Sequence, residues 1–263
     1  MKKIVFLCML FFAACSTKQV VTTTYVQNPS LLVNGKLFAT VFQQKSAEYR
    51  ALCFQAFNIA RFSLDNYKPL TNKPKAIITD IDETLLDNSP YETQRLLQGK
   101  DYEPSSWNEW TSKGIADTMP GSVSFLKYAA SKGVSIFYIT NRDEKERAGT
   151  LKNLKLFNMP NADSIHIMHR QNISSKEARR LRVNTTHEIV MMLGDNLSDF
   201  SSLFDKKPAN ERLRNTNFSA SDFGSRFIVL PNPVYGDWES VMYNYNKYTL
   251  VQKDSVIRSV LKP

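Results

Sequence analysis

Cysteine is scarce in this sequence, and no internal repeat or low-complexity tract is present. Only three cysteines occur in 263 residues, and Cys8 and Cys15 both lie at the extreme N-terminus. Cys53 stands alone between Leu52 and Phe54, where a small buried thiol is expected rather than a nucleophile. A disulfide framework is therefore excluded, and the lack of repeats indicates a globular chain stabilised by its core.

The chain is basic, but it lacks the pattern of a nucleic-acid-binding protein. The formal net charge is +9 at pH 7, and loss of Lys2 and Lys3 with an N-terminal signal lowers it to +7. No arginine-rich patch is interleaved with aromatic residues, which excludes a nucleic-acid polymer as ligand. The positive excess suits anionic lipid or phosphate-bearing substrates, although a solvated basic surface accounts for it equally well.

The N-terminal segment has the layout of a bacterial export signal. Two lysines precede an apolar run from Ile4 to Ala14, which is too short to span a bilayer but suits a signal peptide. The residues Phe12-Ala13-Ala14-Cys15 resemble a lipobox, in which the cysteine is acylated before cleavage. We predict a signal peptide over 1–14 and a tether over 15–34 that is lipid-anchored through Cys15. The alternative is an ordinary signal peptide cleaved near Ala14.

Residues 35–263 are expected to form a single catalytic domain of the α/β class. Short apolar runs read as buried strands, and stretches with helical patterns separate them. This alternation predicts a doubly wound, Rossmann-like parallel sheet. We expect a helical extension over 35–70 and a small cap insertion over 88–118. The expected strands are 76–79, 134–140, 164–168, 188–193 and 226–230.

Two aspartates follow the first expected strand. Asp80 lies at the carboxyl end of that strand, which is where open α/β sheets bind ligands, and Asp82 follows on the same side. Two carboxylates so close repel each other unless a cation compensates, so the pair implies a metal. The alternative is that Asp82 or Thr84 only caps a helix.

Polar residues at later strand ends and helix starts complete the parts needed for phosphoryl transfer. Asp80 would be the nucleophile and Asp82 the general acid and base, while Thr140, Asn141 and Lys176 would bind the phosphoryl group. Asp195 would bind a metal together with Asp80 and the backbone carbonyl of Asp82, and Asp199 would hold a metal-bound water or orient Lys176. Ligation by oxygen alone favours Mg²⁺ over zinc. Singly, Thr140, Lys176 and Gly194-Asp195 each have an ordinary structural explanation.

Two segments carry a resemblance to a known family. The segments from Ile78 to Tyr91, with Asp80-Ile81-Asp82-Glu83-Thr84 at its centre, and from Val190 to Phe200 resemble the paired signatures of class C acid phosphatases. These are bacterial outer-membrane lipoproteins of the haloacid dehalogenase-like superfamily. The resemblance extends over about residues 36–262, with Thr79 in place of the usual apolar residue.

The resemblance implies Mg²⁺-dependent hydrolysis of phosphomonoesters at acidic pH, often of nucleoside monophosphates. Tyr235 matches the family's substrate-side tyrosine, and Trp107, Trp110 or Tyr91 would stack on the opposite face of the base. For Trp107 and Trp110, burial in the cap is the alternative. By the same resemblance, Ser16 after the lipidated cysteine favours the outer membrane.

Two other functions remain as alternatives at this stage. A membrane-anchored nucleotide- or haem-binding protein on the same fold would not need its nucleophile, whereas this chain keeps Asp80. A phosphotransferase would form the same intermediate and pass the phosphoryl group to an alcohol. The sequence leaves open whether the chain is a monomer or a homodimer.

Overall fold

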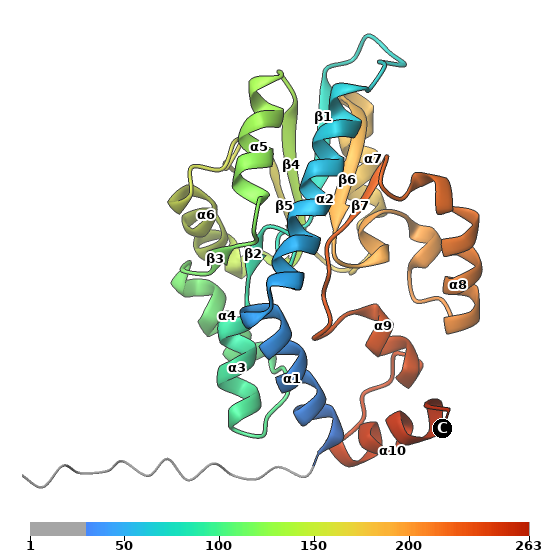
Figure 1. The fold of residues 1–263 in the computed structure, drawn as a ribbon. Coiled ribbons are helices and arrows are strands. Elements are labelled where there is room, and N and C mark those ends of the chain that lie inside the picture. The colour runs from blue at the N-terminus through green and yellow to red at the C-terminus, as the bar shows by residue number, and fades with distance from the viewer. Residues whose placement is uncertain (1–29, 263) are drawn as a thin grey trace, which may run out of the picture.

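The computed structural model describes residues 30–262, so the predicted signal peptide and the lipidation residue Cys15 lie outside the described residues. Within this range a five-stranded parallel sheet has the order β5-β4-β1-β6-β7, and a two-stranded antiparallel ribbon pairs β2 with β3 (Figure 1). The predicted α/β fold with a parallel sheet is confirmed. The strands are β1 (Lys75–Thr79), β2 (Leu86–Asp87), β3 (Asp117–Thr118), β4 (Ser135–Asp143), β5 (Ile167–Arg170), β6 (Glu188–Gly194) and β7 (Phe227–Val229).

Strand β1 lies at the centre of the sheet because both of its faces are apolar. Ala76, Ile77 and Ile78 are all buried, and β1 pairs with β4 on one side and with β6 on the other. The backbone amide of Asp80 then donates to the carbonyl of Leu193 at 2.9 Å. The residues that follow β1, β4 and β6 therefore meet at one edge of the sheet.

Helices cover both faces of the sheet (Figure 1). On one face α2 (Ala47–Asp65) and α5 (Ser122–Ser131) pack together over β1 through Phe57 and Phe125, and α6 (Arg147–Leu156) adds Leu154 to the same apolar cluster. On the other face α7 (Glu177–Thr186) places Val183 against Ile78 and Phe137. No helix in residues 30–262 is long and apolar enough to cross a membrane.

The tether predicted for 15–34 ends earlier than expected, because α1 (Leu31–Lys45) begins at Leu31. The hydroxyl of Ser30 accepts a bond from the amide of Val33 at 3.4 Å, and the carboxylate of Asp254 accepts from the Ser30 hydroxyl and the Leu32 amide at 2.9 Å each. These bonds satisfy amides that a helix start leaves without partners, so the predicted boundary is wrong for residues 31–34.

The expected cap, residues 88–118, forms α3 (Ser89–Leu97), α4 (Pro104–Lys113) and β3. Together with α1 and the C-terminal helices, it lies beyond the sheet in the lower half of Figure 1. The remaining helices are α8 (Ala209–Phe218), α9 (Asp237–Ser240) and α10 (Leu250–Val260), and short 3-10 helices are η1 (Glu144–Glu146), η2 (Leu197–Asp199), η3 (Ser202–Phe204), η4 (Ala220–Asp222) and η5 (Val241–Tyr243).

A buried ion network joins the cap to α1 and to the C-terminal helices. The ammonium of Lys36 lies 2.9 Å from carboxylate oxygens of both Asp101 and Glu239, and Lys253 lies 2.7 Å from Asp101. Glu92 is buried beside them. Burial, together with the nearby charges of Asp101 and Glu239, raises the pKa of Glu92 to about 7, although Lys36 opposes this shift.

We expect Glu92→Gln to become more stable than the wild type as the pH rises. A glutamate whose folded pKa is about 7, against an ordinary 4.5, contributes stability below pH 4.5 and loses it as the pH rises through 7. Between about pH 5 and pH 8 the stability of the variant relative to the wild type should rise by roughly 2–3 kcal/mol. Urea unfolding at both pH values measures this difference.

The matched control is Glu109→Gln, because the Glu109 side chain is 73% exposed in a helical ion pair with Lys113. Its stability should follow that of the wild type with pH. The prediction would be contradicted if the free energy of unfolding of Glu92→Gln differed from that of the wild type by the same amount at both pH values.

Candidate active site

Asp80 is held at the end of β1 by a buried lysine. The ammonium of Lys176 forms an ion pair with Asp80 and a second one with Asp199 at 2.7 Å. Lys176 stands immediately before α7, and only 3% of its surface is exposed. Although burial lowers the pKa of Lys176, the two carboxylates raise it above its ordinary value, so the ammonium stays charged.

Asp195 and Asp199 are placed by the turn that follows β6. Asn196 caps η2, and its own amide donates to the carboxylate of Asp199 at 3.0 Å. The amide of the Asn232 side chain donates to Asp195 at 2.8 Å. Gly194 leaves room for this arrangement, since a Cβ there would lie 2.4 Å from a carboxylate oxygen of Asp199.

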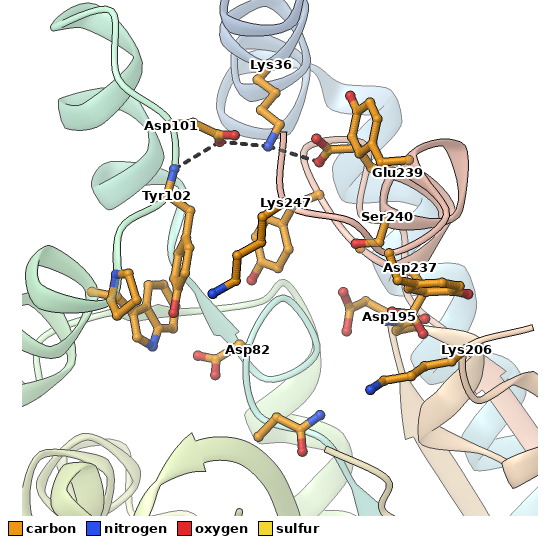
Figure 2. A pocket seen from close by; sticks show the side chains of 18 of the residues that line it. Lys36, Asp82, Asp101, Tyr102, Asp195, Lys206, Asp237, Glu239, Ser240 and Lys247 are labelled. Carbon is orange, nitrogen blue, oxygen red and sulfur yellow. Dashed lines mark hydrogen bonds and ion pairs between the residues drawn. The ribbon is translucent and has the colours of Figure 1, made fainter. Parts of the chain in front are cut away.

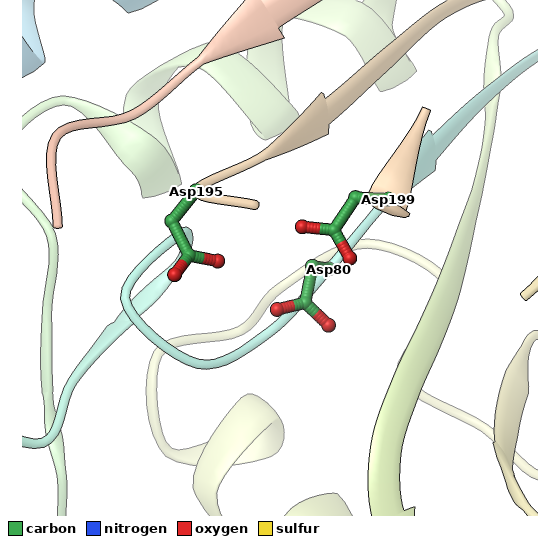
Figure 3. A group of neighbouring side chains, drawn as sticks. All are labelled: Asp80, Asp195 and Asp199. Atoms are coloured by element: carbon green, nitrogen blue, oxygen red, sulfur yellow. The ribbon is translucent and has the colours of Figure 1, made fainter. Parts of the chain in front are cut away.

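Three carboxylates converge at this edge of the sheet (Figure 3). One oxygen from each of Asp80, Asp195 and Asp199 lies within 4.8 Å of the others. Burial is the main cause that raises the pKa of Asp80 to about 7. The charge of Lys176 opposes this shift, and the charges of Asp199 and Asp82 add to it. Burial, followed by the charges of Asp199 and Asp80, raises the pKa of Asp195 well above its ordinary range. Buried oxygen ligands with one ammonium among them fit a hard divalent cation.

The structure changes the predicted ligand set in one respect. Asp199 was predicted to hold a metal-bound water or to orient Lys176. It forms an ion pair with Lys176, and its carboxylate also belongs to the group of three. Asp82 was assigned to the metal through its backbone carbonyl only, and its side chain lies outside the group. Arg142 holds it at 2.7 Å, and the side-chain amide of Asn88 donates to it at 2.9 Å.

Arg142 is the main site residue that sequence reasoning missed. Its side chain is 1% exposed, and its Nε lies 3.1 Å and its Nη2 2.7 Å from the two oxygens of Asp82. This two-pronged contact fixes the orientation of the carboxylate, which lines the cavity. The signal that could have found Arg142 is its place two residues beyond the expected strand 134–140, next to Asn141.

Thr140 and Asn141, the two residues of β4 that were predicted to bind phosphoryl oxygens, differ in their access to the cavity. Thr140 is fully buried, and its hydroxyl accepts a bond from the amide of Arg142 at 3.1 Å. It is not among the residues that line the cavity, whereas Asn141 lines it. The side-chain oxygen of Asn141 accepts from Arg179 at 2.9 Å, which leaves its amide nitrogen available as a donor.

A cavity of about 830 Å³ opens above the carboxylates. Trp107 lines it from the cap, together with Tyr102, a residue that the sequence analysis had not singled out. Tyr235 lines it from the loop after β7. Tyr91 does not line it. Only 2% of Tyr91 is exposed, with its ring edge-on to Trp107 at 5.1 Å, so the prediction that Tyr91 stacks on substrate is wrong. Trp110 packs against the core and donates to the side chain of Asn88 at 2.8 Å.

Tyr235 is fixed by a buried acid from the loop after β1. Its hydroxyl donates to the carboxylate of Glu83, which also accepts from the amide of Asn88 at 2.9 Å. Glu83 is fully buried with φ +52°, a backbone conformation that a glutamate adopts only when its surroundings impose it. Burial, followed by the charge of Glu83, raises the pKa of Tyr235 well above its ordinary value.

Comparisons with known proteins agree on one family. The family model described as HAD superfamily, subfamily IIIB (acid phosphatase), matches residues 6–238. The solved class C acid phosphatase of Bacillus anthracis superposes with a TM-score of 0.85 at 41% identity, covering 88% of this chain and 98% of that one. A second structure of the Bacillus anthracis enzyme, with tungstate bound, gives a TM-score of 0.84 at 41% identity, covering 89% and 98%.

Plant relatives match over shorter stretches. Acid phosphatase 1 of Solanum lycopersicum is 30% identical over 77 residues, which cover 29% of this chain and 30% of the tomato protein. A stem 31 kDa glycoprotein of Glycine max is 25% identical over 167 residues, covering 60% of this chain and 57% of the soybean protein. This chain thus spans less than two thirds of these relatives.

We expect Gly194→Ala to weaken binding of a divalent cation. The new methyl group would displace Asp199 from the carboxylate group, since its Cβ would lie 2.5 Å from the Cβ of Asp199. Displacing a ligand or its support in this way typically costs about 10–100-fold in metal affinity. Calorimetric titration of the folded variant with Mg²⁺ measures the loss.

Gly35→Ala serves as the control, because no atom lies within 4 Å of the added Cβ in the middle of α1. It should bind the cation like the wild type and be slightly more stable. Unchanged affinity in Gly194→Ala would show that Asp199 is not needed in the group.

Proposed function

This chain belongs to subfamily IIIB of the HAD superfamily, the acid phosphatases, and on that basis we propose that it hydrolyses small phosphomonoesters, nucleoside monophosphates among them, with Asp80 as nucleophile. One observation carries the proposal. Asp80 lies at the carboxyl end of the central strand and forms an ion pair with Lys176. It belongs to the cluster of three carboxylates that line a cavity of about 830 Å³. A cavity of this size suits a nucleotide.

The chemistry follows from the placement of the side chains. The carboxylate of Asp80 attacks phosphorus, and the bond from phosphorus to the ester oxygen breaks. Asp82 gives its proton to the departing alkoxide and then takes a proton from the water that attacks the aspartyl-phosphate, which releases phosphate. Arg142 orients Asp82 throughout by its two contacts with the carboxylate.

The phosphoryl oxygens need positive charge and donors near Asp80. The ammonium of Lys176 and the side-chain amide of Asn141 are suitable, since both residues line the cavity. A divalent cation, for which we propose Mg²⁺, would be held by Asp80, Asp195 and Asp199 and would offset their charge and that of the substrate. Thr140 would support the site indirectly, because its hydroxyl accepts a hydrogen bond from the backbone amide of Arg142.

Aromatic walls support nucleoside monophosphates as substrates. Tyr235 on one side and Trp107 with Tyr102 on the other line the cavity. A flat base stacks on such rings with little preference for its identity, so several nucleotides should be accepted. The hydrogen bond from Tyr235 to Glu83 fixes one of these walls.

The decisive experiment is phosphate release from nucleoside monophosphates and an aryl phosphate at mildly acidic pH. We expect release to stop with EDTA, to return with Mg²⁺, and to fall by at least about 10³-fold in Asp80→Asn, because the nucleophile is lost. Nucleoside monophosphates should give the higher kcat/KM. Asp117→Asn, at an exposed position of β3, is the matched control and should retain activity.

Other outcomes select the alternatives. A folded, Mg²⁺-loaded wild type that binds nucleotides but releases no phosphate would be a binding protein. Transfer of the phosphoryl group to an added alcohol in preference to water would identify a phosphotransferase. Activity of Asp80→Asn equal to that of the wild type would refute Asp80 as nucleophile.

We also propose that the chain is exported and anchored in the bacterial outer membrane through lipid on Cys15. The support is the N-terminal sequence, with Lys2 and Lys3 before an apolar run and small residues before the cysteine. In cells fed a labelled fatty acid, the wild type and Cys8→Ser should carry label and sediment with outer membranes, whereas Cys15→Ser should not. Label that persists in Cys15→Ser would refute the anchor.

A further inference from the structure

Two lysines that line the cavity have no partner. Elsewhere in the lining, each cationic side chain forms an ion pair with a carboxylate, as Lys176 does with Asp80 and Asp199. Lys206 and Lys247 are the exceptions among the lining residues. In the part of the chain that the structure describes, no carboxylate lies within 4.0 Å of either ammonium and no hydrogen-bond acceptor contacts it. The paired cations are Lys36, Arg142, Arg170, Lys176 and Lys253.

Both side chains extend into the cavity from loops outside the sheet. Lys206 lies between η3 and α8, and Lys247 lies between η5 and α10. Figure 2 shows the ammonium of Lys247 reaching from the C-terminal segment toward the side of the cavity where Tyr102 and Asp82 stand, and that of Lys206 on the side of Asp195. Two separate loops thus direct free positive charge into one cavity.

Neither lysine is paired with a carboxylate of the proposed reacting centre. Neither ammonium is within ion-pair distance of the carboxylates of Asp80, Asp82 or Asp195, so neither contacts the residues that would surround the scissile phosphoryl group. That group already has Lys176 beside it. Because Lys176 already lies beside the proposed nucleophile, the two free ammonium groups are available to another anionic part of the substrate.

An unpaired ammonium facing a cavity suits an anion, and phosphate is a common partner of lysine. Building on the proposed phosphatase activity, we propose that Lys206 and Lys247 bind a second phosphoryl group of the substrate. The preferred substrates are then phosphomonoesters that carry two phosphoryl groups, such as nucleoside bisphosphates. The hydroxyl of Ser240 also lines the cavity and has no hydrogen-bond partner among residues 30–262, which gives the second group a neutral donor.

The size of the cavity and its two unpaired lysines agree with this substrate class. A volume of about 830 Å³ exceeds what a single phosphoryl group and a small alcohol would fill. The part of the lining that contains Lys36 and Lys253 adds no net positive charge, since both lysines are paired with Asp101. Lys206 and Lys247 are therefore the source of attraction for a second anion.

The test compares adenosine 3′,5′-bisphosphate with adenosine 5′-monophosphate. For each of Lys206→Gln and Lys247→Gln, the ratio of the two kcat/KM values, bisphosphate over monophosphate, should fall about tenfold, as expected for one lost charge-assisted contact at a solvent-exposed site. In the wild type this ratio should exceed one. Lys207→Gln is the matched control, because Lys207 is adjacent but pairs with Glu211 at 2.9 Å and does not line the cavity. Its ratio should equal that of the wild type.

Each other result decides the question. Equal losses on both substrates would place the lysines at the scissile phosphoryl group and overturn the proposal, and so would an unchanged ratio in both variants. If the wild type releases phosphate from neither compound, the phosphatase proposal fails on its own. Calorimetric binding of the two compounds to the wild type and the lysine variants then still tests the second-phosphoryl site, with tighter binding of the bisphosphate expected only when both lysines are present.

Discussion

The ammonium of Lys176, shared between Asp80 and Asp199, is the interaction on which the rest of the site depends. Three carboxylates at one edge of a sheet repel each other strongly, those of Asp80 and Asp199 buried and that of Asp195 half-buried, and a single buried lysine cannot offset them all. Burial raises the pKa values of Asp80 and Asp195, and repulsion between neighbouring carboxylates adds to the shift. The site is thus built for further positive charge, and without it the same residues would only weaken the fold.

The sheet topology explains how residues so far apart in sequence reach this edge. Because β1 lies between β4 and β6, the segments that follow these three strands emerge next to one another. Asp80 and Asp195 come directly after β1 and β6, and Arg142 lies in the last residues of β4. Lys176 arrives from the start of α7, which packs on the sheet through Val183. The apolar runs that bury the strands therefore also determine which polar groups meet.

The sequence allowed the parallel sheet and the positions of Asp80, Lys176 and Asp195 to be predicted, because continuous apolar runs mark buried strands and polar residues follow them. It did not reveal which side chains pair across the edge. The contact of Arg142 with Asp82 joins residues 60 apart, and no local pattern encodes it. Tyr91 was misassigned for a related reason, since only the packing of α3 against α4 decides whether its ring faces the cavity or the interior of the cap.

The cavity wall is coupled to the catalytic loop through one hydrogen bond. Glu83 belongs to the turn that follows Asp82, and its buried carboxylate accepts a hydrogen bond from the hydroxyl of Tyr235 in the loop after β7. Its strained backbone, at φ +52°, is maintained because the Asn88 amide and Tyr235 both bind that carboxylate. A change that frees Tyr235 would leave a buried acid with fewer donors and relax the turn carrying Asp82. Substrate recognition and the chemistry at Asp80 and Asp82 therefore rest on the same few buried polar contacts, whereas Lys206 and Lys247, on outer loops, are free to vary without disturbing them.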